Sequence, residues 1–263
     1  MIRSIIRPNT SSFVRKPTGL YFWEGGDTLF DFSSIPDLGM CLLPGMGYTT
    51  VGTSNDRLEV WQSQFVNSKA EVYPATSMRP TLVTDSGTGL SVPQFDGKDD
   101  RMLLYESDGS NYSHPNTINS GEGTTFYLIR SDANQRMILF SDYDNNGYGL
   151  AADTGSSSSG LFSSYGTPSF RYNKTIAGYA NRGDVWNGLF GNDDLRLSTE
   201  ISVDISGWSA PQIGGYRNET NRTFMYKGLT FAFLHYKREL NLNEIQTVEN
   251  KLEKLVGQLG QPV

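Results

Sequence analysis

The stretch that decides the fold is Gly207–Val256, which reads GWSAPQIGGYRNETNRTFMYKGLTFAFLHYKRELNLNEIQTVENKLEKLV. Two strand-like runs, RTFMY and GLTFAFLHY, are separated by a polar turn and lead directly into a segment with helical periodicity. A β-rich chain that ends in one amphipathic helix is typical of a sandwich whose edge or end is covered by that helix.

The helix is expected at about residues 242–256. Asn241 is a suitable N-cap, and Glu244, three positions later, completes a capping box. Gly257 then supplies a stop signal. The expected buried face carries Ile245, Val248, Leu252, Leu255 and Val256, and the expected solvent face carries Glu249, Lys251, Glu253 and Lys254.

The composition favours many strands joined by tight turns. The chain has 263 residues, of which 12% are aromatic and 28 are glycine. That length suits one large β domain or two small ones. The formal net charge of −6 argues against a protein that binds nucleic acid through its charge.

Cysteine and histidine are too scarce for several kinds of site. Cys41 is the single cysteine, so the chain has no internal disulfide framework, and its apolar neighbours predict a buried packing role. The two histidines, His114 and His235, stand without a nucleophile motif and are interpreted as structural. The opening MIRSIIRPNT does not resemble a secretory signal, and no stretch predicts membrane insertion.

Residues 1–28 differ from the remainder and are predicted to form an extended N-terminal arm. They are polar, contain prolines, and carry four cationic side chains: Arg3, Arg7, Arg15 and Lys16. A segment of this composition cannot bury much of its own surface, so we expect a neighbouring subunit to hold it. Residues 29–263 are assigned to one domain.

About a dozen short apolar runs, separated by turn residues, fill residues 29–236. The clearest hairpin signals are TTFYLIR (Thr124–Arg130), RMILFS (Arg136–Ser141) and the Asp96-Gly97 turn. A Ser/Gly tract at 155–160 predicts a loop. The fold class predicted is therefore all-β, as a two-sheet antiparallel β-sandwich with one C-terminal helix.

The order of these signals resembles the concanavalin A-like jelly rolls, in particular the LamG-like type found in phage structural proteins and bacterial surface proteins. Four blocks carry the resemblance: FDFSSIPDLGMCL (Phe30–Leu42), RLEVWQSQ (Arg57–Gln64), RPTLVTDSGTGLSVPQFDGKDDRMLL (Arg79–Leu104) and IGG…YKGLTFAFLHYKRELNLNEIQTVENKL (Ile213–Leu252). The resemblance implies a jelly-roll sandwich. It does not select a function, because this fold hosts lectins, glycanases and structural modules.

Glycanases of this fold use paired carboxylates that project from one face of a strand. The nearest candidates are Glu200 with Asp204, whose spacing of four predicts a shared face, and the acidic run Asp96–Asp100. The usual third acidic residue is absent beside the first pair, and the second group lies in a turn. Solvent-facing acids and turn formers are the favoured interpretation of both.

A loop with the pattern D-x-D-x-N-G is a candidate calcium site. Its oxygen ligands would come from Asp142, Asp144, Asn146 and Asp153. A hairpin turn rich in turn-forming residues explains the same letters, because strand-like runs and not helices flank the loop.

Sugar binding would require exposed aromatic rings beside hydrogen-bonding side chains. The aromatic residues on or beside polar loops, and thus the glycan-binding candidates, are Tyr112, Tyr143, Tyr148 and Tyr165.

These observations favour a non-enzymatic structural protein of a phage virion, which is a capsid decoration, fibre or tail-associated subunit. The expected partners are other virion subunits, including further copies of the chain, which the arm contacts. The alternative is a carbohydrate-binding module that recognises host-surface glycans, with calcium as its one candidate cofactor. A glycanase is the third hypothesis.

Overall fold

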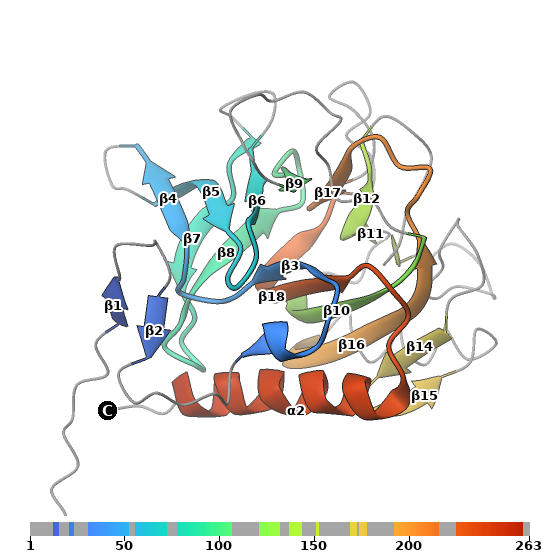
Figure 1. The fold of residues 1–263 in the computed structure, drawn as a ribbon. Coiled ribbons are helices and arrows are strands. Elements are labelled where there is room, and N and C mark those ends of the chain that lie inside the picture. The colour runs from blue at the N-terminus through green and yellow to red at the C-terminus, as the bar shows by residue number, and fades with distance from the viewer. Residues whose placement is uncertain are drawn as a thin grey trace, which may run out of the picture.

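The structure is a computed structural model that describes residues 13–15, 21–23, 31–52, 56–72, 78–106, 121–131, 137–143, 151–152, 169–172, 174–177, 192–215 and 225–259. Antiparallel β-structure dominates this part of the chain (Figure 1). Fourteen strands are hydrogen-bonded into one large curled sheet, and the helix α2 (Leu242–Leu259) lies along the outside of the curl. The mainly-β prediction is confirmed.

The strands of the main sheet follow one another closely along the chain. They are β3 (Leu38–Leu42), β4 (Tyr48–Val51), β5 (Arg57–Gln62), β6 (Ser68–Glu71), β7 (Thr81–Thr84), β8 (Ser91–Asp96), β9 (Met102–Glu106), β10 (Glu122–Ser131), β12 (Phe140–Asp142), β14 (Ser169–Tyr172), β15 (Thr175–Ala177), β16 (Asn192–Asp204), β17 (Pro211–Ile213) and β18 (Lys227–Tyr236). A short 3-10 helix, η2 (Phe32–Ser34), precedes β3. A separate two-stranded sheet pairs β11 (Met137–Ile138) with β13 (Ala151–Ala152).

The sheet runs in the order β12-β17-β9-β6-β5-β7-β8-β18-β10-β16-β14-β15, with β4 added beside β5 and β3 beside β18. The two halves meet between β5 and β7 through a single residue pair, Arg57 with Thr81. The Arg57 guanidinium strengthens this corner, because it donates to Thr81 Oγ1 at 2.9 Å and to the Arg79 carbonyl at 3.2 Å. Backbone hydrogen bonding therefore defines one sheet where the sequence predicts two.

Two hydrophobic cores lie on opposite faces of the central strands. The inner core fills the curl between the two halves, and aromatic rings from distant strands meet there. The centre of the Phe233 ring lies 5.7 Å from that of Tyr127 and 5.2 Å from that of Phe140. The outer core lies between the sheet and α2. Strands β10 and β18 are buried on both faces, which explains why their sequences are almost continuously apolar.

The helix begins as the sequence predicts. The Asn241 side chain accepts from the Glu244 amide at 3.1 Å, and Glu244 accepts from the Asn241 amide at 2.9 Å, which completes the capping box. Two details of the prediction are wrong. Glu249 is 1% exposed and faces the sheet, and α2 continues through Gly257 to Leu259, since one interior glycine costs only about 1 kcal/mol.

Only part of the predicted N-terminal arm is described. The strands β1 (Phe13–Arg15) and β2 (Tyr21–Trp23) pair with each other and not with the main sheet, with Arg15 opposite Tyr21. Arg3, Arg7 and Lys16 lie outside the described residues. The described part of the chain has no helix that combines the length and apolar character needed to cross a membrane.

Gly214 is a position where a side chain should be strongly destabilising. Its φ is +97°, and an added Cβ would enter the Phe95 ring and lie 2.7 Å from the Asp100 carbonyl oxygen. We expect Gly214→Ala to reduce the free energy of unfolding by about 2–5 kcal/mol, measured by urea denaturation. Gly45 is the matched control, because its φ is +70° with nothing within 4 Å, so Gly45→Ala should cost only about 1–2 kcal/mol. Equal losses in the two variants would contradict the packing argument.

Candidate functional site

Polar side chains form a buried row on the inner face of the sheet. Thr125 of β10 stands directly opposite Glu200 of β16 on one side and His235 of β18 on the other. All three side chains are 0% exposed. Thr125 Oγ1 and His235 Nδ1 are hydrogen-bonded at 2.9 Å, and Tyr127 donates its hydroxyl to Glu200 Oε2 at 2.8 Å. Glu200 Oε1 has no partner among the described residues.

Burial decides the protonation of this row. Loss of water raises the pKa of Glu200 to about 8, although the hydrogen bond from Tyr127 acts in the opposite direction. Burial also lowers the pKa of His235 to about 3, and the positive charge of Lys237 adds to that effect. Near neutral pH the carboxyl is therefore protonated and the imidazole is uncharged. Both groups are sealed inside the fold, where a substrate in solvent cannot reach them.

Glu200 and Asp204 do not share a face, contrary to the spacing argument. A bulge between Gly123 and Thr124 interrupts the β10–β16 ladder, and Ser202 has a φ of +64°. Ser202 is the extra residue of this bulge. Because of it, the side chain of Val203 enters the inner core, where uninterrupted alternation would have placed the even-numbered residues. Asp204 instead has its pKa lowered by a hydrogen bond from the Ser206 side chain and, to a lesser extent, by one from the Ser206 amide at 2.9 Å.

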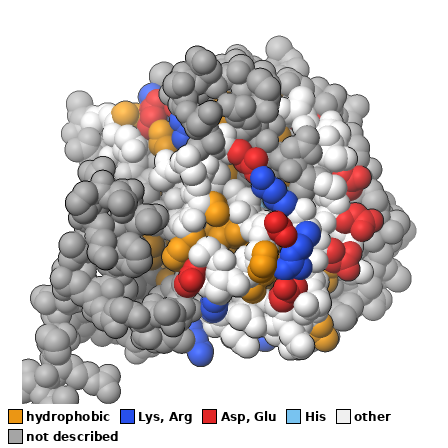
Figure 2. Space-filling model, in the orientation of Figure 1, with side chains coloured by type: hydrophobic (Ala, Val, Ile, Leu, Met, Phe, Trp, Pro, Cys, Tyr) orange, Lys and Arg blue, Asp and Glu red, His pale blue; other side chains and the backbone are white. Residues whose placement is uncertain are grey.

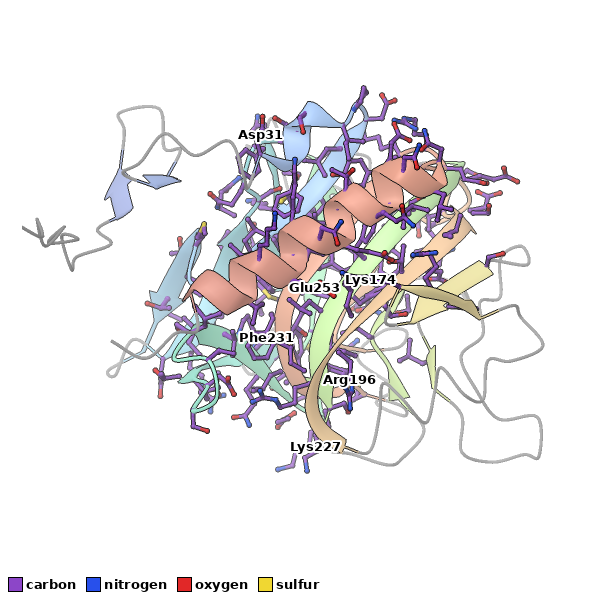
Figure 3. All side chains as sticks on the ribbon, turned by 90° about the horizontal axis from the view of Figure 1, so that it is seen from below. Asp31, Lys174, Arg196, Lys227, Phe231 and Glu253 are labelled. Carbon is purple, nitrogen blue, oxygen red and sulfur yellow. The ribbon has the colours of Figure 1, made fainter. Side chains whose placement is uncertain are left out.

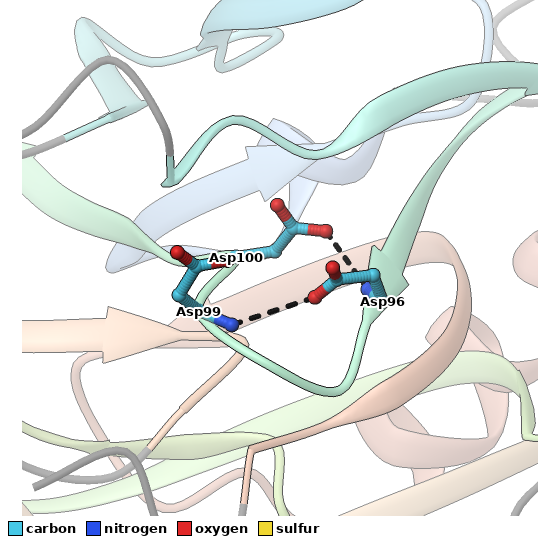
Figure 4. A group of neighbouring side chains, drawn as sticks. All are labelled: Asp96, Asp99 and Asp100. Atoms are coloured by element: carbon cyan, nitrogen blue, oxygen red, sulfur yellow. Dashed lines mark hydrogen bonds between the residues drawn. The ribbon is translucent and has the colours of Figure 1, made fainter.

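The acidic run at the β8–β9 turn brings three carboxylates together (Figure 4). Asp96 Oδ1 accepts from the amides of Lys98 at 2.8 Å and Asp99 at 3.4 Å, while Asp100 Oδ2 accepts from the Asp96 amide at 2.8 Å. Burial raises the pKa of Asp100 to about 7, and the charge of Asp96 adds to it. These bonds close the turn, as the sequence indicates for aspartates beside Gly97.

Only Asp142 of the proposed calcium loop is described. It is 0% exposed and accepts from the Ala210 amide at 2.9 Å and from the Ser209 amide at 3.2 Å. Both carboxylate oxygens thus connect β12 to the segment that precedes β17. Asp144, Asn146 and Asp153 lie outside the described residues, so the calcium loop stays a prediction.

Tyr143 is the one glycan-binding candidate within the described residues. It is 8% exposed, packs with Leu103, Tyr105 and Ala210, and lies 5.8 Å below the Arg101 guanidinium. Its ring is therefore occupied by protein contacts. The other candidates, Tyr112, Tyr148 and Tyr165, lie outside the described residues, as does His114.

A pocket of about 310 Å³ opens where β8, β18 and β10 run side by side. Exposed Gln94 and Asp96 come from β8, Lys227 and half-buried Leu229 from β18, and Arg130 from the end of β10. The pairs Lys227–Asp96 and Leu229–Gln94 are direct cross-strand neighbours, so their side chains meet on one face. The pocket is on the outer surface, away from the buried row.

Arg130 is held firmly at the pocket wall. Its Nη1 forms an ion pair with Asp85, whose side chain is 2% exposed, and its guanidinium carbon lies 5.5 Å from the centre of the Phe231 ring. Asp85 is itself fixed by the Thr88 amide at 2.8 Å. At the adjacent Gly228, a Cβ would lie 2.7 Å from Tyr226 Oη, so only glycine fits. Sequence reasoning missed this site, because its residues come from three segments that are far apart in the chain.

The surface mixes charges of both signs on the face that Figure 2 shows. Arg238 pairs with Glu244 at 2.6 Å and with Asp37 at 3.3 Å, and Lys237 pairs with Glu106. Each of these cationic side chains therefore lies beside a carboxylate.

Comparison with known proteins adds no assignment: no family model matches the chain, and no curated protein matches it.

Proposed function

We propose that this protein is a non-enzymatic structural subunit of a phage virion, serving as a capsid decoration, fibre or tail-associated protein. In this proposal its LamG-like jelly roll faces outward and residues 1–28 dock it to neighbouring subunits. The non-enzymatic part of the proposal is supported by the sealing of its central acid and base, because Glu200 and His235 are both 0% exposed and uncharged near neutral pH. A catalytic acid or base needs contact with its substrate. The virion part is supported by the resemblance of four sequence blocks to LamG-like phage proteins.

The jelly-roll description is part of the proposal. Its support is the single residue pair, Arg57 with Thr81, that joins the two halves of the curled sheet, together with an inner core to which both halves contribute. If that pair is treated as a corner, two antiparallel sheets face each other as in a sandwich. The four sequence blocks that resemble the family fall on η2 to β3, β5, β7 to β9, and β17 to α2.

Deleting residues 1–28 tests the docking role. We expect the truncated chain to unfold at nearly the same urea concentration as the full chain, since β1 and β2 pair only with each other within the described residues. We expect it to be lost from assembled particles, measured by co-sedimentation with purified virions, and to lose self-association in light scattering. A truncated chain that joins particles at the normal level would overturn the proposal.

A carbohydrate-binding module is the second candidate, and the pocket at Gln94, Asp96, Arg130 and Lys227 favours it. Amide, carboxylate and guanidinium groups that converge on one depression are suited to sugar hydroxyls. A virion lectin would satisfy both proposals. A glycan array read with and without a chelator tests this candidate and its calcium assistance together, and binding to no sugar would overturn it.

A further inference from the structure

We propose that a second copy of this chain seats its N-terminal hairpin, β1–β2, on an apolar patch at the turn between β5 and β6. Met46, Phe65 and Val66 form this patch, which we call the tip patch. The inference rests on the proposed docking role of residues 1–28, and it names the partner and the surface that the arm contacts.

The turn between β5 and β6 carries unusual residues for a turn. Residues 63–67 read SQFVN, so an aromatic and a β-branched residue stand where glycine, asparagine or aspartate is usual. Phe65 has a φ of +70°, which is a rare conformation for a bulky residue. Backbone strain of this kind persists only where the surrounding structure holds it, and it is concentrated at sites that bind or switch.

Hydrogen bonds and ring packing hold this turn in one conformation. The Gln64 amide donates to the Cys41 carbonyl at 2.7 Å, and the Cys41 amide donates to Ser63 Oγ at 2.7 Å. The Phe65 ring meets the Phe32 ring edge to face, with 6.2 Å between their centres. A partner therefore meets a preformed surface, and little conformational entropy of the turn is lost on binding.

The tip patch is apolar and reaches the surface. Met46, Phe65 and Val66 are each half-buried, and all three pack against the outer core. The Gln62 amide donates to the Gly47 carbonyl at 2.7 Å, which joins the loop that carries Met46 to the end of β5. Figure 2 shows apolar side chains gathered on the face that this turn occupies. A rigid, partly exposed apolar cluster is suited to the centre of a protein–protein interface.

The N-terminal hairpin needs such a surface. Five of the six residues in β1 and β2 are aromatic or aliphatic, and the register places Phe13 opposite Trp23 and Val14 opposite Phe22. A two-stranded hairpin is at best marginally stable alone, and β1 and β2 add no strand to the main sheet. Packing against an apolar surface would supply the stability that the pairing of two short strands lacks.

The linker of the hairpin ends beside the tip patch. Residues 24–30 connect β2 to Asp31, and a linker of seven residues spans at most about 25 Å. Lys251 Nζ donates to the Asp31 carbonyl at 2.5 Å and so fixes this end against α2, and Figure 3 shows Asp31 along the flank of the helix. The next residue, Phe32, contacts Phe65. A copy whose hairpin reaches a partner's patch therefore brings its own patch close to the partner's hairpin, as a two-fold exchange requires.

Charge favours contact between the arm of one copy and the body of another. Residues 1–28 carry four cationic and two acidic side chains, a net charge of +2, so the rest of the chain carries −8. Two such bodies repel each other, whereas each attracts the arm of the other.

The area available is sufficient for a stable dimer. An aromatic side chain can bury about 150–250 Å², so the three aromatic residues of β2 in two exchanged hairpins would remove roughly 900–1,500 Å² from water. Stable interfaces bury about 1,200–2,000 Å² in total, and the covered patches add to the area from the hairpins.

The test is sedimentation velocity of the full-length protein over a range of concentrations. We expect a dimer that dissociates on dilution and weakens as salt is raised, because arm and body have opposite charge. Phe65→Asn and Val66→Ser should each raise the dimer dissociation constant roughly tenfold. Asparagine accepts a positive φ, so the first variant keeps the turn. Leu242→Ser is the control, since it removes a side chain that is 48% exposed at the start of α2, and it should change the constant less than about twofold.

Mixing two variants tests whether the contact is made between copies. Phe65→Asn retains the hairpin and Trp23→Ser retains the patch, so each should be largely monomeric alone. Their mixture should associate, because one chain supplies a hairpin and the other a patch. A mixture that stays monomeric would exclude exchange.

The remaining outcomes separate this inference from the docking role on which it rests. A wild-type chain that is monomeric at every concentration would overturn the second copy as partner, and co-sedimentation with virions would still decide the docking role. Self-association that requires residues 1–28 but survives Phe65→Asn and Val66→Ser would overturn the tip patch alone. Self-association that survives deletion of residues 1–28 would contradict both.

Discussion

Replacing Glu249 with alanine is expected to remove about 3–5 kcal/mol from the free energy of unfolding, which is the usual cost of leaving a buried charge unpaired. Glu249 accepts from Arg171 Nε at 2.9 Å and from Arg171 Nη2 at 3.0 Å in a bidentate ion pair. Thr199 adds a hydrogen bond at 3.0 Å. Arg171 is only 3% exposed, so the truncation leaves its charge between β14 and α2 without its carboxylate.

Urea denaturation of matched variants measures this effect. Glu253, which lies on the same helix as Glu249, is the control. It pairs with Lys174 at 2.5 Å, but its side chain is 50% exposed. Exposed ion pairs contribute little, so Glu253→Ala should cost less than about 1 kcal/mol. The double variant Arg171→Met with Glu249→Leu removes both charges and should recover much of the loss. A loss for Glu249→Ala no greater than that for Glu253→Ala would show that the buried pair does not hold the helix to the sheet.

Acid should destabilise the protein through His235. Its pKa is about 3 in the folded protein against 6.5 for an exposed histidine, so the unfolded chain takes up a proton that the folded chain excludes. The stabilisation is fully present above pH 6.5 and is lost as the pH falls toward 3. The contribution of His235 to the free energy of unfolding therefore falls by roughly 5 kcal/mol between pH 6.5 and pH 3, at about 1.4 kcal/mol for each pH unit between the two pKa values.

The measurement compares wild type with His235→Asn by urea denaturation at intervals from pH 7 to pH 3. Asn retains a hydrogen-bonding group near Thr125 but cannot titrate, so its unfolding free energy should fall less steeply across this window. The difference in slope is the readout, and an overall loss of stability in the variant does not affect it. Parallel profiles for the two proteins would rule out His235 as the titrating group.

Glu200 acts in the opposite direction. Its folded pKa of about 8 exceeds the value of 4.5 for an exposed glutamate, so its contribution is complete below pH 4.5 and is lost as the pH rises to 8. Glu200→Gln should therefore gain stability relative to wild type over this range. Between pH 4.5 and 6.5 the stabilisation from His235 rises with pH while that from Glu200 falls. The two contributions from this buried row should therefore nearly cancel in that range.

Local features of the chain were predicted well. The strand runs, the Asp96–Gly97 turn and the capping box at Asn241 depend on residues within a few positions of one another. Cys41 is buried as its apolar neighbours indicate. Such features follow from backbone preference and hydrophobic period, which a sequence displays directly.

Prediction from the sequence fails at the bulge in the β10–β16 ladder. A spacing of four predicts one face for Glu200 and Asp204 only if the strand alternates without interruption. Ser202 adopts a positive φ, which a serine in the sequence does not predict, and every side chain after it changes face. Glu249 is a similar case, because a charged residue on a helix predicts solvent unless Arg171 from a distant hairpin is known to lie opposite.

By itself, then, the sequence determined a β-rich chain, its turns and its terminal helix, since these are set by neighbours along the backbone. The tertiary structure decided which charges are buried, how the two halves of the sheet are joined at Arg57 and Thr81, and where the pocket lies. Gln94, Arg130 and Lys227 carry no motif. They line one pocket only because strand pairing brings three remote segments together on one face of the sheet.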